Sequence, residues 1–399
     1  MKTELTRRIE SKEAVIGIIG MGYVGLPLAL RFSEAGFRVL GFDLDPAKAE
    51  SIADRQSYFA HIADARISAA VDCGLAVTTD MVRSAECDAI IICVPTPLGS
   101  HQEPDLSFIT GTMESLINHL RPGQVICLES TTYPGTTDEE IVPRAEQAGL
   151  NVGEDVFVVY SPEREDPGNQ TFHTQTIPKV VGGVTPVCLE VGEVLYGQVI
   201  DEVVSVSSTR VAEMTKLLEN IHRAVNIGLV NELKMVTDKM GIDIFEVINA
   251  AASKPFGFTP YYPGPGLGGH CIPIDPFYLT WKAKEYGVHT RFIELAGEVN
   301  TAMPQWVISK IEQALNDRCK AVNGSRILVI GVAYKRDTND TRESTGLEIY
   351  ASLEKRGAIV SYHDPFVSVL PVTRQHALAG TSVSLNSANI ANQDCVLIC

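Results

Sequence analysis

The chain has 399 residues, which is long enough for two or three domains. Apolar residues make up 45% of it and charged residues 21%, and this composition excludes a mostly disordered protein. The 49 acidic and 33 basic residues give a net charge of −16, so we expect neither nucleic acid nor an anionic membrane surface as a partner.

The first predicted strand leads into a glycine-rich turn. Residues 14–19 form a short apolar run that fits a buried parallel strand, and residues 26–35 continue in a helical pattern. Between them lies a G-x-G-x-x-G turn, whose residues we expect to bind the pyrophosphate of a dinucleotide: Gly20, Gly22, Tyr23, Val24 and Gly25. A tight turn that binds no ligand is the alternative interpretation.

The next predicted strand, residues 38–43, ends in Asp43, 18 residues after Gly25. A carboxylate at this distance typically accepts hydrogen bonds from the adenosine ribose and repels a 2′-phosphate, so the sequence predicts NAD rather than NADP. The uncharged stretch 14–30 looks much like a signal peptide. It contains four glycines and a proline and is too short for a comfortable membrane span, so we expect neither export nor insertion.

Alternating strands and helices continue along the chain and predict a doubly wound parallel sheet. Strands are expected at 89–94, 124–128 and 156–160, with helices at 106–120 and after Pro134. Ligands bind at the carboxyl ends of such strands. One segment there is 94–97, with Pro95 and Thr96 as expected cofactor contacts, although alone it could be an ordinary loop. The other segment holds Glu163.

Residues 205–240 have a different character. Their apolar side chains recur at helical spacing over 36 residues without a proline, and Gly241 follows. We therefore expect one helix of roughly 50 Å that connects two domains. Lys216 and Asn220 are four residues apart and share a face of this helix. They could donate hydrogen bonds to a developing oxyanion, and a solvated stripe is the other interpretation.

The loop 261–275 carries the strongest chemical pattern. Four glycines and three prolines surround Cys271, and Asp275 follows four residues later. This polar, glycine-lined setting suits a nucleophilic thiol, and the backbone N–H groups of the loop could bind phosphate. A buried structural cysteine is the alternative. The neighbouring His270 fits a structural role better than a catalytic one.

The other cysteines have no C-x-x-C spacing and most stand in apolar stretches, which predicts reduced, buried thiols of a cytosolic protein. The nine histidines are scattered and form no Cys/His cluster, so no metal site is predicted. A second strand–turn–helix pattern begins at 326–331, with further strands expected at 358–362 and 382–385. The last residues, 394–399, look like the middle of a buried strand, so we expect residues missing beyond them.

These patterns predict an α/β protein of two Rossmann-like, doubly wound domains joined by a long central helix. The expected divisions are an NAD-binding domain at 1–204, a central helical region at 205–317 and a second Rossmann-like domain at 318–399.

In this order, the motifs resemble the UDP-glucose/GDP-mannose dehydrogenase family over residues 14–399. The resemblance rests on seven blocks: Gly20–Gly25, Val94–Pro97, Ser130-Thr131, Ser161–Arg164, Glu213–Asn220, Gly264–Asp275, and Ala333–Asp337 with Asp340 and Arg342. The runs 254–258 and 276–282 look most like the branch that oxidises UDP-N-acetylglucosamine for bacterial surface polysaccharides. Enzymes for UDP-N-acetylmannosamine, UDP-N-acetylgalactosamine and UDP-glucose are the alternatives.

The resemblance implies a four-electron oxidation of the C6 alcohol to a carboxylate with two NAD⁺, through a thiohemiacetal and a thioester on Cys271. In the family's roles Lys216 and Asn220 stabilise the oxyanions, Asp275 and Glu163 position or deprotonate water, and Thr131 lies beside them and the cofactor. The implied substrate contacts are Glu163, Arg164, Lys216, Asn220, Tyr261, Tyr262, Gly268 and Lys335, with Arg342 at the cofactor. The last domain would hold UDP, and the long helix would form the core of a homodimer.

Two features depart from the family pattern. Lys254-Pro255 stand where UDP-glucose enzymes place an arginine that reaches into the partner's site, and the chain ends before the family's final segment. Two rival functions stay open. A two-electron dehydrogenase of the 3-hydroxyacid type would yield one NADH per substrate without needing Cys271, and a non-catalytic NAD-binding regulator would tolerate Lys216→Ala.

Overall fold

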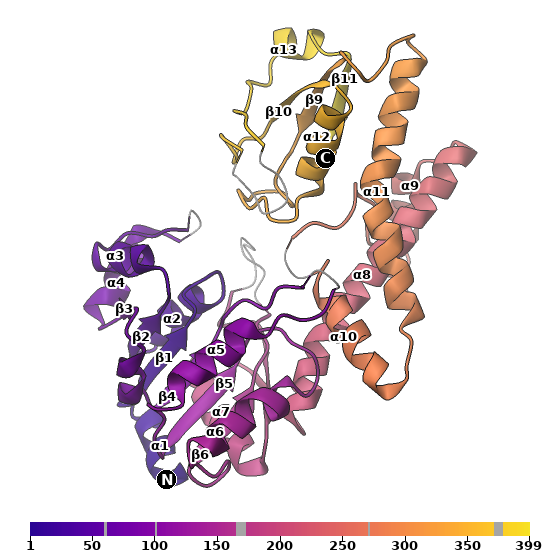
Figure 1. The fold of residues 1–399 in the computed structure, drawn as a ribbon. Coiled ribbons are helices and arrows are strands. Elements are labelled where there is room, and N and C mark those ends of the chain that lie inside the picture. The colour runs from indigo at the N-terminus through magenta and orange to yellow at the C-terminus, as the bar shows by residue number, and fades with distance from the viewer. Residues whose placement is uncertain (60–61, 100–101, 165–172, 270–271, 371–377) are drawn as a thin grey trace. The chain divides into compact units, whose positions relative to one another are not determined.

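The computed structural model describes residues 1–59, 62–99, 102–164, 173–269, 272–370 and 378–399 (Figure 1). The chain divides into two compact units, Met1–Leu218 (unit 1) and Glu219–Cys399 (unit 2). It is an α/β protein with two Rossmann-like sheets and a long helix, α8 (Thr209–Met240), as the sequence predicts.

Unit 1 is built on an eight-stranded sheet with the order β3-β2-β1-β4-β5-β6-β7-β8. Neighbouring strands pair in parallel except β6 and β7, which are antiparallel. The order of the first six strands is that of a dinucleotide-binding sheet. The strands are β1 (Val15–Ile19), β2 (Arg38–Phe42), β3 (Ala76–Thr78), β4 (Ala89–Ile92), β5 (Gln124–Leu128), β6 (Val156–Tyr160), β7 (Lys179–Gly183) and β8 (Val203–Val206).

Helices cover both faces of this sheet. The helices before α8 are α1 (Lys2–Glu10), α2 (Gly25–Glu34), α3 (Pro46–Ala53), α4 (Asp64–Asp72), η1 (Met81–Glu86), α5 (Ser107–Leu116), η2 (Thr137–Ile141), α6 (Val142–Gln147) and α7 (Pro186–Tyr196). One core lies between the sheet and α1, α2 and α7, and a second core includes residues of α5 and α6. Because both faces are covered, the central strands are continuous apolar runs.

Three predicted helices of unit 1 have different bounds in the structure. Helix α8 begins at Thr209 rather than at residue 205, because residues 203–206 pair with β7 as strand β8. Helix α5 ends at Leu116, four residues early. The segment after Pro134 splits into a π-helical turn, η2, and α6, and Pro143, which has no N–H to donate, lies in the first turn of α6.

Unit 2 contains the rest of α8 and a small parallel sheet with the order β10-β9-β11. Its elements are α9 (Ile244–Ala252), α10 (Asp275–Ala283), η3 (Lys284–Tyr286), α11 (Arg291–Asn316), β9 (Arg326–Ile330), α12 (Thr345–Lys355), β10 (Ile359–His363), α13 (Ser387–Ala391) and β11 (Cys395–Ile398). Helix α12 packs on this sheet through two apolar clusters, and the second cluster also contains residues of α11.

One prediction about the end of the chain is wrong. Residues 382–385 form no strand. The N–H of Ser382 donates to the carbonyl oxygen of Ser368, and its hydroxyl bonds to the backbone of Asp364. Strand β11 is present at the predicted place and pairs in parallel with β9. Val396 and Ile398 are both exposed.

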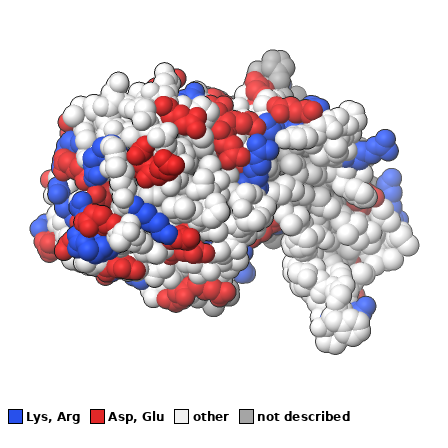
Figure 2. All heavy atoms as spheres, turned by 90° about the horizontal axis from the view of Figure 1, so that it is seen from below, with Lys and Arg blue, Asp and Glu red and all other residues white. Residues whose placement is uncertain are grey.

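The eight described cysteines are all free thiols. Cys87, Cys127 and Cys188 are buried as predicted, whereas Cys73, Cys319 and Cys399 are exposed, contrary to the prediction. On the face shown in Figure 2, acidic and basic side chains are interspersed rather than separated into regions of one sign. None of the helices in the described ranges is both long and apolar enough to cross a bilayer.

The buried carboxylate of Glu213 ties the start of α8 to the sheet of unit 1. Its side chain is fully buried and accepts three hydrogen bonds: from Gly135 N (2.5 Å), Thr137 N (2.9 Å) and Thr137 Oγ1 (2.7 Å). The two N–H groups lie just before and at the start of η2, where backbone N–H groups have no acceptor within the helix and need one from elsewhere. Burial raises the pKa of Glu213 to about 7, although these donors act in the opposite direction.

This pKa predicts a pH-dependent stability. Because the folded state binds the Glu213 proton more tightly than the unfolded chain, the stabilisation is complete below about pH 4.5 and is lost as the pH rises through about 7. We expect the free energy of unfolding of the wild type, relative to that of Glu213→Gln, to fall by up to about 3 kcal/mol over this range. Urea unfolding followed by circular dichroism measures it, and a constant or rising difference would contradict the prediction.

Candidate active site

The glycine-rich turn of unit 1 joins β1 to α2 at the carboxyl edge of the sheet. A Cβ on Gly25 would lie 1.9 Å from the carbonyl oxygen of Gly20, so the turn and α2 can meet only if this residue is glycine. Gly20 has a φ of +92° and also lacks room for a side chain. A Cβ on Gly22 would instead meet nothing within 4 Å. The turn thus leaves open space at Gly22, beside the N-terminus of α2, where a pyrophosphate could approach the backbone.

The carboxylate of Asp43, which follows β2, is held against the same turn. It accepts hydrogen bonds from Met21 N (2.9 Å), from Asp45 N (3.0 Å) and from the ammonium of Lys48 (2.7 Å). Its side chain is only 12% exposed. The structure therefore places Asp43 beside the Gly20–Gly25 turn, with a defined orientation.

The loops after β4 and β5 are tied to each other at this edge. Thr96 donates a hydrogen bond through Oγ1 to the carbonyl oxygen of Thr131 (2.7 Å), and Ser130 donates through Oγ to that of Val94 (2.7 Å). The structure thus brings together three predicted residues, Pro95, Thr96 and Thr131.

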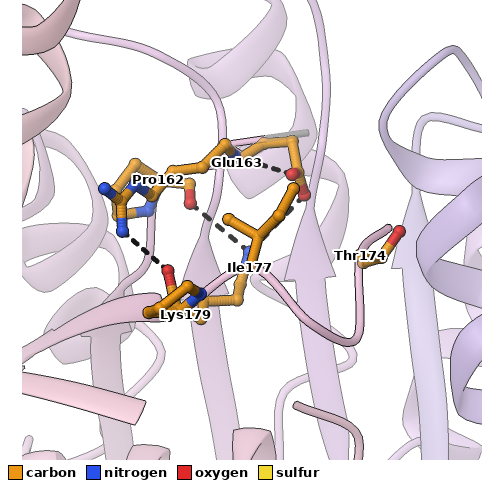
Figure 3. A pocket seen from close by; sticks show the side chains of 7 residues that line it. Pro162, Glu163, Thr174, Ile177 and Lys179 are labelled. Atoms are coloured by element: carbon orange, nitrogen blue, oxygen red, sulfur yellow. Dashed lines mark hydrogen bonds and ion pairs between the residues drawn. The ribbon is translucent and has the colours of Figure 1, made fainter. Parts of the chain in front are cut away.

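Glu163 follows β6 and lines a small pocket in unit 1, together with Pro162, Arg164, Thr174, Ile177, Pro178 and Lys179 (Figure 3). The ammonium of Lys216, on α8, donates a hydrogen bond to the main-chain oxygen of Glu163 (2.5 Å). Arg164 donates to the carbonyl oxygen of Pro178 (2.7 Å). Glu163, Arg164 and Lys216, all predicted from the sequence, therefore belong to one cluster.

Behind Glu163 lies a buried polar network that the sequence analysis missed. The ammonium of Lys179 is 3.0 Å from Glu129 Oε2 and 3.5 Å from Glu163 Oε2. Tyr196 donates through its hydroxyl to Glu129 Oε1 (2.5 Å), and its oxygen is 2.9 Å from Cys127 Sγ. The one indication in the sequence was a carboxylate, Glu129, directly after a buried strand.

The network changes the proton affinity of its members. Burial raises the pKa of Glu129, against the attraction of Lys179. Burial alone would lower the pKa of Lys179, but the carboxylates of Glu129 and Glu163 outweigh it and raise that pKa, so the ammonium stays charged.

In unit 2, two predicted residues meet in a buried contact. Asn220 donates through Nδ2 to Asp275 Oδ2 (2.5 Å), and the two residues are 6% and 2% exposed. Asp275 is the first residue of α10 and stands four residues after Cys271. His270 and Cys271 lie outside the described residues, so the predicted nucleophile has no described geometry.

Two buried asparagines missed by the sequence analysis hold the start of the 264–269 loop. Asn231, on α8, accepts a hydrogen bond at Oδ1 from Gly264 N (3.0 Å) and donates through Nδ2 to Asn300 Oδ1 (2.8 Å). Asn300, on α11, donates in turn to the carbonyl oxygen of Ala224 (3.1 Å). A polar residue inside an apolar helical pattern was the only indication of this role.

The far end of the loop packs against the segment after β9. A Cβ on Gly268 or on Gly269 would come within 2.9 Å of Tyr334. Lys335 has its ammonium 5.7 Å from the centre of the Tyr334 ring, and Arg342 pairs with Asp340 at 2.6 Å. The predicted residues Gly268 and Lys335 therefore lie next to the same tyrosine.

Two other predicted substrate contacts have partners of their own. The hydroxyl oxygen of Tyr261 is 3.0 Å from His222 Nδ1, and Tyr262 donates through its hydroxyl to Asn249 Oδ1 (2.8 Å). Within the described ranges, no three His, Cys, Asp or Glu residues form a group that could hold a metal ion.

Three models of the UDP-glucose/GDP-mannose dehydrogenase family match the chain: the NAD-binding domain at residues 14–200, the central domain at 210–302 and the UDP-binding domain at 328–399. The UDP-N-acetyl-D-glucosamine 6-dehydrogenase of Pseudomonas aeruginosa is 35% identical over 92% of this chain and 86% of the relative. The UDP-N-acetyl-D-mannosamine dehydrogenase of Pyrococcus horikoshii is 33% identical over 88% of this chain and 84% of the relative. A solved structure titled UDP-D-ManNAc dehydrogenase from Pyrococcus horikoshii superposes with a TM-score of 0.86 at 31% identity, covering 96% of this chain and 88% of that one.

Two of the three glycines of the Gly20–Gly25 turn, Gly22 and Gly25, are expected to respond differently to alanine. Gly22→Ala should keep the thermal unfolding midpoint of the wild type and weaken NAD⁺ binding at least tenfold, because its Cβ enters only the open space. Gly25→Ala should lower the midpoint, because its Cβ overlaps Gly20. Calorimetric titration and thermal unfolding measure these effects, and unchanged NAD⁺ affinity in Gly22→Ala would contradict the assignment of the turn.

A second pair of variants tests the packing of the loop. Gly268→Ala forces its Cβ into Tyr334, whereas a Cβ on Gly264 meets only one atom at 3.8 Å. We expect faster amide hydrogen exchange at residues 264–269 and 332–336 in Gly268→Ala, and wild-type exchange in Gly264→Ala. Equal exchange in the two variants would show that Tyr334 does not hold the loop.

Proposed function

The chain belongs to the UDP-glucose/GDP-mannose dehydrogenase family, and from this premise we propose that it oxidises the C6 hydroxyl of UDP-N-acetylglucosamine to the carboxylate. The name of the Pseudomonas aeruginosa relative supports this sugar. The name of the Pyrococcus horikoshii relative makes UDP-N-acetylmannosamine the second candidate. The product would serve the synthesis of a bacterial surface polysaccharide.

The family is NAD-dependent, and the residues of unit 1 fit this cofactor. The open space at Gly22 and the N-terminus of α2 suit a pyrophosphate, and the fixed carboxylate of Asp43 suits a ribose and disfavours a 2′-phosphate. When bound, NAD⁺ accepts a hydride from the C6 carbon of the substrate. Pro95, Thr96 and Thr131 would line the same edge, and Arg342 is a further proposed cofactor contact.

The second oxidation requires a nucleophile, because an aldehyde carries no hydride that can leave until a group adds to its carbon. We assign this role to Cys271, whose thiolate would add to C6 and form a thiohemiacetal. Loss of the second hydride, for which a second NAD⁺ is the oxidant, would give a thioester, and water would then cleave it to the carboxylate and release the Cys271 thiolate. Glu163 and Asp275 would position or deprotonate that water. The substrate would contact Arg164, Tyr261, Tyr262, Gly268 and Lys335.

The observation that carries this proposal is the buried contact between Asn220 and Asp275, four residues after Cys271. The contact fixes the Asn220 amide, whose second N–H is the proposed donor to the oxyanion that forms when the thiolate adds. Lys216 is the second proposed donor, and its ammonium is already oriented by the main-chain oxygen of Glu163. A donor set fixed in advance stabilises an oxyanion more than donors that must reorganise.

We also propose a cytoplasmic homodimer that forms through α8. Large apolar side chains on this helix are exposed in the single chain: Leu218, Leu229, Leu233, Val236 and Met240. Such a stripe favours contact with another protein surface. The proposed division into an NAD-binding domain (1–204), a central region (205–317) and a UDP-sugar-binding domain (318–399) accords with the order of the matched family models.

The yield of NADH tests the reaction and the substrate together. With UDP-N-acetylglucosamine we expect close to two NADH per sugar consumed, because both oxidations take place before release. UDP-N-acetylmannosamine, UDP-N-acetylgalactosamine and UDP-glucose should react much more slowly. A yield of one would favour a two-electron dehydrogenase, and absorbance that changes with none of the four sugars would overturn the proposed function.

Replacement of the proposed nucleophile tests the covalent route. Cys271→Ala should lower kcat at least 100-fold, because the aldehyde can no longer be converted to a thioester. Cys319→Ala, which removes an exposed thiol of the same unit, is the matched control and should keep wild-type turnover. Mass spectrometry of quenched wild-type enzyme should find the sugar nucleotide on the peptide that contains Cys271. Wild-type turnover of Cys271→Ala is the outcome that rules the thioester out.

A further inference from the structure

The charged cluster behind Glu163 is unusual because its cation is almost fully buried. The side chain of Lys179 is 5% exposed and that of its partner Glu129 is not exposed at all, whereas that of Glu163 is 14% exposed. Figure 3 shows Lys179 and Glu163 among the side chains that line the same pocket. The burial therefore increases from Glu163, at the pocket, to Glu129, in the core.

Four groups fix the ammonium of Lys179. Three oxygens lie near Lys179 Nζ: Glu129 Oε2 at 3.0 Å, the carbonyl oxygen of Pro162 at 3.4 Å and Glu163 Oε2 at 3.5 Å. The centre of the Tyr196 ring is 5.1 Å from the same nitrogen. Glu129 is itself held on its other oxygen by the hydroxyl of Tyr196. An ammonium held in this way has little freedom to move with the pocket.

We propose that Lys179 is a positioning residue that Glu129 holds in place, and that it keeps the carboxylate of Glu163 ionised and oriented in the pocket. This inference rests on the proposed function, in which Glu163 positions or deprotonates the water that cleaves the thioester. Lys179 acts through Glu163 and does not itself contact the reacting atoms.

Among the described contacts of the Glu163 carboxylate, Lys179 supplies an ammonium at Oε2, and the N–H of Arg164 donates a hydrogen bond to Oε1 (2.6 Å). Lys216 binds the main-chain oxygen of Glu163 and Arg164 binds Pro178. Cys93, Cys127 and Tyr196 stay neutral near pH 7, because burial raises the pKa of each. The carboxylate of Glu129 opposes the ionisation of Glu163.

A purely structural ion pair is the alternative, because buried pairs are often replaceable by neutral groups of similar size at no cost in function. Two variants separate the two roles. Glu129→Gln removes one carboxylate, so the charges of Lys179 and Glu163 then balance each other. The glutamine still offers an oxygen that can accept the hydrogen bond from Tyr196. Lys179→Met/Glu129→Gln then removes the cation without leaving a buried carboxylate unpaired, so it is designed to fold.

Comparison of these two variants isolates the effect of Lys179 on Glu163. A nearby cation lowers the pKa of a carboxyl group, so its removal moves the acid limb of the kcat–pH profile upward. We expect this limb about one pH unit higher in the double variant than in Glu129→Gln, with kcat about tenfold lower and KM changed less than threefold. Lys179→Arg, which keeps the charge, should retain most of the wild-type kcat.

The matched control lies at the opposite edge of the same sheet. Arg121 is 2.8 Å from Asp88, which is 2% exposed and directly precedes β4. Arg121→Met/Asp88→Asn therefore removes an ion pair with a buried carboxylate at the amino ends of the strands, where Asp88 also pairs with Arg8 (2.9 Å). We expect it to lower stability without moving the pH profile. Equal acid limbs and equal kcat values in Glu129→Gln and Lys179→Met/Glu129→Gln would overturn the proposal.

A crystal structure of the double variant gives a readout that needs no activity. We expect the Glu163 carboxylate to leave its wild-type position once the ammonium is absent, and an unmoved carboxylate overturns the proposal even if the wild type oxidises no UDP-sugar. A wild type that oxidises no UDP-sugar would contradict the proposed function but not the positioning role of Lys179. Should the double variant fail to fold, Lys179→Gln/Glu129→Gln supplies the same comparison with a side chain that can still donate to Pro162.

Discussion

Parallel pairing is the constraint on which unit 1 depends. Because β1, β2, β4, β5 and β6 all run in one direction, every segment that follows one of them emerges at the same edge of the sheet. That edge collects the Gly20–Gly25 turn, Asp43, Thr96, Thr131 and Glu163, which are dispersed over more than a hundred residues of sequence. Backbone hydrogen bonding thus assembles the candidate nucleotide site before any ligand contributes.

The features that the sequence predicts well are local ones. The Gly20–Gly25 turn and Asp43 are recognisable because glycine spacing and the end of a strand are short-range patterns, and the structure places them together. Helix α8 begins four residues later than predicted, because residues 203–206 pair with β7, which is distant from them in the sequence. The segment 382–385 is predicted as a strand but forms none, and the hydroxyl of Ser382 bonds there to the backbone of Asp364.

The residues that the sequence could not reveal are those whose partners are distant in the chain. Glu129 and Lys179 are 50 residues apart, and Asn231 and Asn300 are 69 apart. Each alone looks like an ordinary polar residue. The pairs become visible only in the structure, where β7 runs antiparallel beside β6 and α11 packs on α8 at these asparagines. Each buried polar side chain then has a partner that offsets the cost of its burial. Predictions for such residues therefore need a tertiary structure, whatever the quality of the local pattern.

The position of Glu213 has a consequence for protein engineering. The first turns of α8 complete unit 1, since Glu213 supplies the acceptor that the amides of Gly135 and Thr137 need, whereas the remainder of the helix belongs to unit 2. A chimera that joins the nucleotide-binding half of one relative to the other half of another should thus be spliced inside the helix, after residue 218, and not in the loop that precedes it. Splicing in the loop would separate a carboxylate from its donors and leave both halves of the hybrid incomplete.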